Sequence, residues 1–97
     1  MNIGKAIKEI RQSRKMSQSE FAEKCELTQG SISQIENGIV QPSKANLIKI
    51  CEVLGVSEAI IQLKAIEEGD IHPDKIEEFK AFLPFAEQMF TKFLKSS

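Results

Sequence analysis

The chain has 97 residues, of which 41% are hydrophobic and 28% charged, with three Pro and neither Trp nor Tyr. This length gives one domain of ordinary size, and the composition excludes a disordered or fibrous protein. Since no run reaches the roughly 18 apolar residues of a membrane helix and the N-terminus lacks the apolar stretch of a secretion signal, we expect a cytoplasmic protein without membrane contact.

The formal net charge of −1 is unevenly distributed. Residues 1–56 hold eight basic against six acidic residues, whereas residues 57–97 hold five against eight, so any basic surface is expected in the first half. Cys25 and Cys51 lack neighbours at metal-ligand spacing and are expected to be buried thiols. The single histidine, His72, has no nucleophile or metal cluster beside it. The sequence therefore predicts no enzyme, no metal and no cofactor.

Helix signals follow one another from the N-terminus, and no strand alternation occurs. The spacing of Ile3, Ile7 and Ile10 predicts an amphipathic helix over about residues 2–14. Ser17, followed three residues later by Glu20, forms a capping-box pattern that opens a second, short helix ending near Cys25.

A third helix is expected from Gln29 to about Asn37, capped by Thr28 and ended by Gly38 in the left-handed conformation. Ser43 caps a fourth helix, which Gly55 ends, and Ser57 caps a fifth that runs to about Glu68. After a break at residues 69–73, a last helical segment is expected over about residues 74–95.

The third predicted helix carries an unusual polar face. At about 100° per residue, Ile32 and Ile35 lie on one side, and the opposite arc of about 140° holds five small or amide residues: Gln29, Gly30, Ser33, Gln34 and Asn37. Gln and Asn form paired hydrogen bonds with adenine in the major groove of double-stranded DNA. The face therefore suits base reading; the alternative is a merely solvated surface.

Two short helices joined by a tight turn form a helix-turn-helix. The run TQGSISQIENG at residues 28–38, together with Arg11, Ala22 and the LIKICEVLGVS segment at residues 47–57, resembles the Cro and phage-repressor type of helix-turn-helix domain. The resemblance covers residues 7–57. It implies an all-α, five-helix DNA-binding domain, here residues 1–69, followed by a C-terminal segment at residues 70–97.

The resemblance also implies roles for individual residues. The expected base-reading residues are Gln29, Gly30, Ser33 and Gln34, and the expected phosphate-binding residues are Ser17, Gln18, Asn37 and Lys44. Arg11 and Glu36 match a structural ion pair between the first and third helices. Two departures weaken the expected DNA contacts: Gly30 has no side chain, and the loop at residues 39–41 carries no charge.

The C-terminal segment contains five of the six phenylalanines. A heptad assignment gives a seam for a homodimer that consists of Ile76, Phe79, Leu83, Phe90 and Phe93. The alternative is that the segment folds back on its own domain as a sixth helix. Pro84 is expected to kink this helix or restart it.

The predicted function is sequence-specific repression by a homodimer on an inverted-repeat operator. Glu20 and Glu23 give a second possibility, contact with RNA polymerase in an activator. The competing class is an antitoxin or other partner-binding protein, whose Phe-rich segment binds a second protein while the helix-turn-helix autoregulates its operon.

Overall fold

The computed structural model describes residues 1–95, and every regular element within them is helical. The elements are α1 (Ile3–Ser13), α2 (Gln18–Lys24), α3 (Gln29–Glu36), α4 (Lys44–Leu54), α5 (Glu58–Ala65) and α6 (Ile76–Phe93), with 3-10 turns at Glu68–Asp70 and Pro73–Lys75. The all-α fold class is therefore confirmed. None of the described helices is long and apolar enough to span a membrane.

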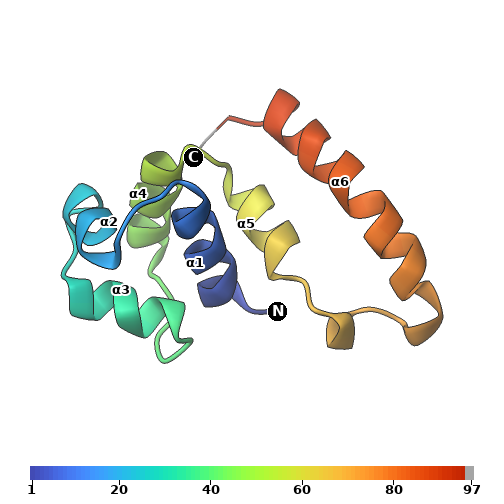
Figure 1. Cartoon of the computed structure of the whole chain (residues 1–97), viewed down its shortest axis with the longest axis horizontal. Helices are drawn as coiled ribbons and strands as arrows, with labels where there is room; N and C mark the ends of the chain where they lie inside the picture. The colour runs from blue at the N-terminus through green and yellow to red at the C-terminus, as the bar shows by residue number, and fades with distance from the viewer. Residues whose placement is uncertain (96–97) are drawn as a thin grey trace.

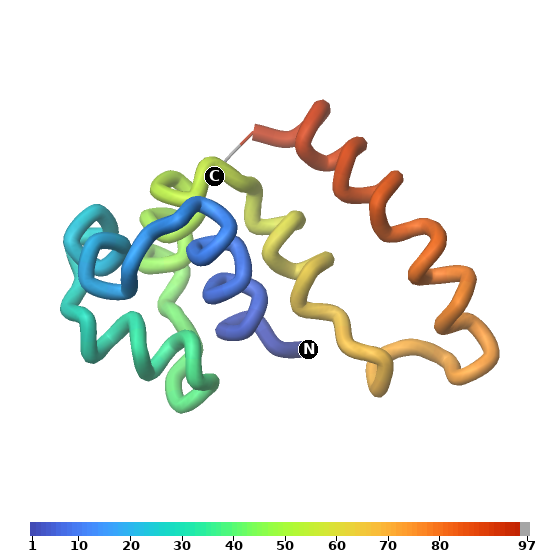
Figure 2. The backbone as a smooth tube through the Cα atoms, in the orientation of Figure 1, coloured from blue at the N-terminus to red at the C-terminus, as the bar shows by residue number. Residues whose placement is uncertain are grey.

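The helices are arranged around α1. Figure 1 shows α2 and α3 at one end of the molecule and α6 at the other, with α1, α4 and α5 between them. The backbone trace in Figure 2 shows that the chain leaves α5, turns through the two 3-10 segments and returns so that α6 runs back along α5. The helix pair α2–α3 is thus presented at the end of the molecule opposite to α6.

Local capping explains why four helices start where they do. Ser17, Thr28, Ser43 and Ser57 each accept a hydrogen bond from the backbone N–H three residues later. A cap of this kind contributes about 1 kcal/mol of helix stability. Gly38 and Gly55 have φ of 75° and 70°, the left-handed conformation that follows a helix end.

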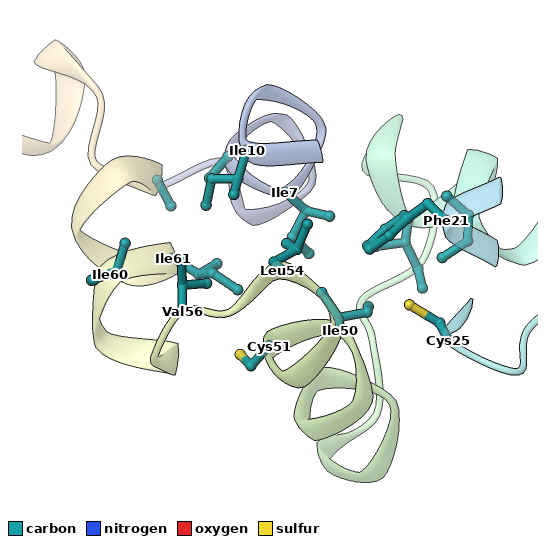
Figure 3. Packing of buried hydrophobic residues seen from close by; sticks show 14 of the residues in the cluster. Ile7, Ile10, Phe21, Cys25, Ile50, Cys51, Leu54, Val56, Ile60 and Ile61 are labelled. Atoms are coloured by element: carbon teal, nitrogen blue, oxygen red, sulfur yellow. The ribbon is translucent and has the colours of Figure 1, made fainter. Parts of the chain in front are cut away.

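Residues from all five helices α1, α2, α3, α4 and α5 form a single apolar core. Among its fully buried side chains are Ile7, Phe21, Ile32, Ile50 and Ile61, several of which are labelled in Figure 3. Cys25 and Cys51 are also buried, as predicted. Burial raises the pKa of the Cys25 thiol to about 11, so this thiol stays protonated at neutral pH.

The predicted end of the fifth helix is wrong. α5 ends at Ala65, and Ile66 is already extended, with φ −66° and ψ 129°. The next residues form a 3-10 turn instead, in which the Glu67 backbone N–H donates to Asp70 Oδ2 over 2.8 Å. The same oxygen accepts a hydrogen bond of 2.7 Å from the α-ammonium group of Met1. A contact with the start of the chain therefore fixes this turn.

The helix does not restart at Pro84, and the kink expected there stays a prediction. α6 continues from Ile76 to Phe93 with Pro84 inside it. A proline removes the hydrogen bond to the carbonyl four residues earlier, which here belongs to Lys80. Both Pro84 and Lys80 are exposed, so water can solvate that carbonyl. The proline is tolerated because it lies on the solvent side of the helix.

α6 packs on its own domain through much of the predicted dimer seam. Ile76, Phe79, Leu83 and Phe90 are half-buried, and Phe90 packs against the core. The ion pairs Lys64–Glu87 at 3.2 Å and Lys80–Glu68 at 2.8 Å hold the helix to α5 and to the first 3-10 turn. Of the five seam residues only Phe93 is exposed, so the seam as predicted faces mainly inward, as in the sixth-helix alternative.

Candidate nucleic-acid interface

The amide-rich surface of α3 faces solvent. Ile32 and Ile35 are 0% and 4% exposed and fix one side of the helix in the core. Gln29, Gly30, Gln34 and Asn37 are exposed, and Ser33 is half-buried. A side chain at position 30 would meet open space, since a Cβ there would approach nothing closer than Thr28 Oγ1 at 4.0 Å. The side of α3 predicted to read bases is therefore accessible.

The turn between α2 and α3 is tight. The Leu27 backbone N–H donates to the carbonyl of Ala22 over 2.9 Å, and Glu26 between them has φ of 59°. The left-handed conformation is costly for a residue with a Cβ, by about 1–2 kcal/mol, and the packing of Phe21 and Ala22 in the core holds it in place. The two helices consequently keep a fixed relative orientation.

Arg11 and Glu36 connect α1 to the C-terminal end of α3. Arg11 Nε donates to Glu36 Oε2 over 2.7 Å, and Arg11 Nη2 donates to Glu36 Oε1 over 3.0 Å. The remaining guanidinium nitrogen, Nη1, donates to the carbonyl of Met16 over 2.8 Å. Both residues are buried, at 7% and 5% exposure. This bidentate ion pair fixes α3 against α1.

Gln18 belongs to the same buried network. Its Nε2 donates to Glu36 Oε1 over 3.1 Å, and the residue is half-buried. Gln18 was expected to bind a DNA phosphate, but in this structure its side-chain amide helps to satisfy Glu36. The amide nitrogen has a second N–H, which can donate to a phosphate while the bond to Glu36 stays in place.

Gly4 contributes to the position of α3, and sequence reasoning did not identify it. A Cβ at this position would overlap the carbonyl oxygen of Ile35 and would lie 2.8 Å from that of Glu36. α1 and α3 therefore approach each other at backbone distance. The sequence signal was a glycine within an otherwise regular helical pattern, which is often the mark of close packing.

The other expected phosphate-binding residues lie around α3, and they differ in the contacts that their side chains already make. Ser17 Oγ accepts from the Glu20 N–H over 3.1 Å as the cap of α2. Asn37 is exposed, and its Nδ2 lies 3.4 Å from Ser33 Oγ. Lys44 is exposed but forms an ion pair of 2.6 Å with Glu58. Only an exposed pair holds this lysine, so it can reorient at little cost.

The loop after α3 is uncharged and exposed. Ile39 and Val40 are 70% and 44% exposed, and both backbone N–H groups donate to the carbonyl of Gln34. The loop is therefore folded back toward α3. Its lack of basic side chains limits the electrostatic attraction that most DNA-binding surfaces obtain from lysine and arginine.

Two features of the described residues bear on metal binding and catalysis, namely the placement of metal-ligating side chains and the surroundings of the single histidine. Residues 1–95 contain no group of three or more His, Cys, Asp or Glu placed to hold a metal ion. His72 is exposed at the start of the second 3-10 turn. The exposed face of α3 therefore consists of amide, hydroxyl and glycine residues without a metal-ligating cluster.

The fold and this surface define a helix-turn-helix DNA-binding protein. The chain belongs to the helix-turn-helix family of the Cro and phage-repressor type, whose family model matches residues 7–61. The members of this family are DNA-binding transcriptional regulators.

Among curated proteins, the immunity repressor protein of Bacillus phage phi105 is 34% identical to this chain over 61 residues. The match covers 63% of this chain and 42% of that repressor, so it extends over less than half of the relative. No solved structure matches the chain.

Proposed function

We propose that this regulator is a repressor that binds an inverted-repeat operator in double-stranded DNA as a homodimer. The observation that carries the proposal is the exposed amide face of α3, held in place by the buried Arg11–Glu36 pair. The name of the phage relative, an immunity repressor, supports repression as the mode of action. A helix-turn-helix of this size covers one half-site, and two copies are needed for a palindromic operator.

In this proposal, Gln29 and Gln34 read base edges in the major groove, because each presents a donor and an acceptor to solvent from α3. Ser33 and the backbone at Gly30 complete the reading surface. Asn37, Lys44 and the N-terminal end of α2 at Ser17 contact phosphates. Gln18 supports this set indirectly, through its hydrogen bond to Glu36.

The reading face is tested by Gln29→Ala and Gln34→Ala. Each should lose about 1–3 kcal/mol of binding free energy on the preferred site, with little change on unrelated DNA. Gln62→Ala is a matched control, because Gln62 is an exposed amide on α5 and does not belong to the proposed DNA-binding surface. Fluorescence titrations against a selected and a scrambled duplex measure both effects. Equal weakening on the two duplexes would show that these amides position the protein and do not specify the sequence.

A further inference from the structure

α6 presents an exposed apolar stripe that is distinct from the face it packs on its own domain. The stripe consists of Phe82, Phe85, Met89 and Phe93, which are 53%, 57%, 37% and 64% exposed. The rings of Phe82 and Phe85 contact each other, with centroids 6.2 Å apart. Taking about 200 Å² for a whole phenylalanine side chain, the four residues expose on the order of 400 Å² of apolar surface per copy.

The stripe lies to the side of α6. At about 100° per residue, its mean direction is about 80° away from the direction of Ala86 and Phe90, the residues that pack inward. Figure 1 shows α6 and α3 at opposite ends of the molecule. A second copy docked on the side of α6 would therefore be related by a two-fold axis that runs roughly from α6 toward α3. Both reading helices would then lie on the same side of the dimer.

Charges on either side of Phe85 are self-complementary. Glu78 lies seven residues before Phe85 and Lys92 seven residues after it, while Phe82 and Met89 lie three before and four after. Two copies of α6 that cross antiparallel at Phe85 would place Glu78 of each beside Lys92 of the other and Phe82 beside Met89. A parallel pair would place like charges together. Glu78 is exposed and forms only an exposed ion pair of 3.5 Å with Lys75 of the same chain, while the Lys92 ammonium lies 5.3 Å from the centroid of the neighbouring Phe93 ring at the surface.

We propose that a second copy of this chain docks on the stripe as an antiparallel α6 pair centred on Phe85. The inference rests on the proposed function for the need of two reading helices, and it replaces the seam expected from the heptad pattern. Two copies of the stripe together contribute on the order of 800 Å² of apolar surface. With the flanking charged residues, the total surface buried by both copies reaches the range of small specific interfaces.

The first test measures oligomeric state without DNA, by light scattering on the whole chain. The native protein should be a dimer and Phe85→Asp a monomer, because a charge would lie on the two-fold axis. Ile39→Asp, at an exposed apolar residue of the loop after α3, should leave the dimer intact. Circular dichroism should show all three chains folded.

A second test determines the orientation of the two helices. Glu78→Lys and Lys92→Glu should each raise the dimer dissociation constant about tenfold at low salt, since two ion pairs become like-charge contacts. The combined variant, with both charges exchanged, should restore the native value to within about threefold. Single reversals without effect, or a double variant weaker than both singles, would overturn the antiparallel arrangement.

Failure of the inference is separable from failure of the proposed function. A native chain that is monomeric at about 100 µM but still binds a single half-site would refute the α6 dimer and the homodimer part of the proposed function, whereas DNA reading by α3 would stand. A native dimer that shows no preference for any DNA sequence would refute the function alone. Phe85→Asp should keep half-site binding and lose tight binding to the full operator.

Discussion

Among single residues, one buried ion pair holds the position of α3. Arg11 and Glu36 satisfy each other and also bond to Met16 and Gln18, so removing either leaves a charge without its main partner. Breaking a buried pair in this way costs about 3–5 kcal/mol. An exposed pair contributes about 0–1 kcal/mol. The two ranges are far enough apart to be distinguished in solution.

We therefore expect Arg11→Ala and Glu36→Ala each to lower the free energy of unfolding by about 3–5 kcal/mol, with strong coupling in a double-mutant cycle. The matched control is the exposed pair Lys44–Glu58, whose cycle should show about 0–1 kcal/mol. Urea unfolding followed by circular dichroism measures both cycles. A coupling for Arg11 and Glu36 no larger than that of the control would mean that the pair is not what holds α3.

The sequence predicted some residue roles better than others, for a physical reason. The accessibility of Gln29 and Gln34 follows from helix periodicity, because Ile32 and Ile35 must turn inward. The bond from Gln18 to Glu36 does not follow from periodicity, since the two residues lie on different helices and 18 positions apart. Contacts of that kind depend on how the helices pack, which a local pattern does not contain.

At the scale of helices, the packing of α1 on α3 is controlled by Gly4. Alanine is the better helix former by about 1 kcal/mol, but here its Cβ would overlap the carbonyl oxygen of Ile35. Relief of that overlap requires α1 and α3 to separate, at a cost that exceeds the gain in helix propensity; overpacking of a core costs about 1–3 kcal/mol. The net effect of Gly4→Ala should be destabilising.

Gly30→Ala provides the matched control for this prediction. Gly30 also lies in a helix, but its Cβ would enter open space. It should raise stability by about 1 kcal/mol through helix propensity alone. Thermal melting of both variants decides the matter. A Gly4→Ala protein as stable as the native chain would show that the two backbones can move apart freely.

Helix starts were predictable from the sequence, whereas one helix end was not. Ser17, Thr28, Ser43 and Ser57 act within three residues of themselves, so their effect can be identified from a short stretch of sequence. At the end of α5 the Ala65 carbonyl accepts a hydrogen bond from the Asn2 backbone N–H, and Asp70 in the next turn bonds to the α-ammonium group of Met1. A sequence window around residue 66 contains no trace of these long-range contacts.

In the whole molecule, α6 covers α5, and in the proposed dimer it also presents the stripe to a second copy. A chain that ends at Ile71 tests both, because it keeps the contact between Asp70 and Met1. It should remain helical and unfold cooperatively, since the core of α1 to α5 is complete without α6. Its melting temperature should fall, because Phe90 and the Lys64–Glu87 pair are lost.

The truncated chain should also be monomeric and bind a full operator far more weakly than the native protein. Each half-site would then be occupied without a linked neighbour. Light scattering, thermal melting and operator titration on this one protein give the three results. A truncated chain that stays dimeric would place the interface within residues 1–71, and one that unfolds would show that α6 is an essential part of the core.

The heptad pattern could not predict which face of α6 is exposed. Apolar residues cover a wide arc of this helix, and Phe79, Phe82, Phe85, Phe90 and Phe93 lie at different angles within it. A heptad repeat selects one set of these residues, but α5 covers part of the same arc in the folded chain. Which stripe remains for a partner is decided by tertiary packing.

In the proposed dimer, the exposed face of each α3 reads one half of a symmetric DNA sequence. Selection of bound duplexes from a random pool with the native chain, followed by sequencing, tests it most directly. We expect enrichment of an inverted repeat whose half-sites lie about one helical turn, 34 Å, or a multiple of it apart. Adenines are expected at positions contacted by Gln29 and Gln34. Bound duplexes that share no sequence, and that are retained only through salt-sensitive attraction to the DNA phosphate backbone, would contradict sequence-specific reading by α3.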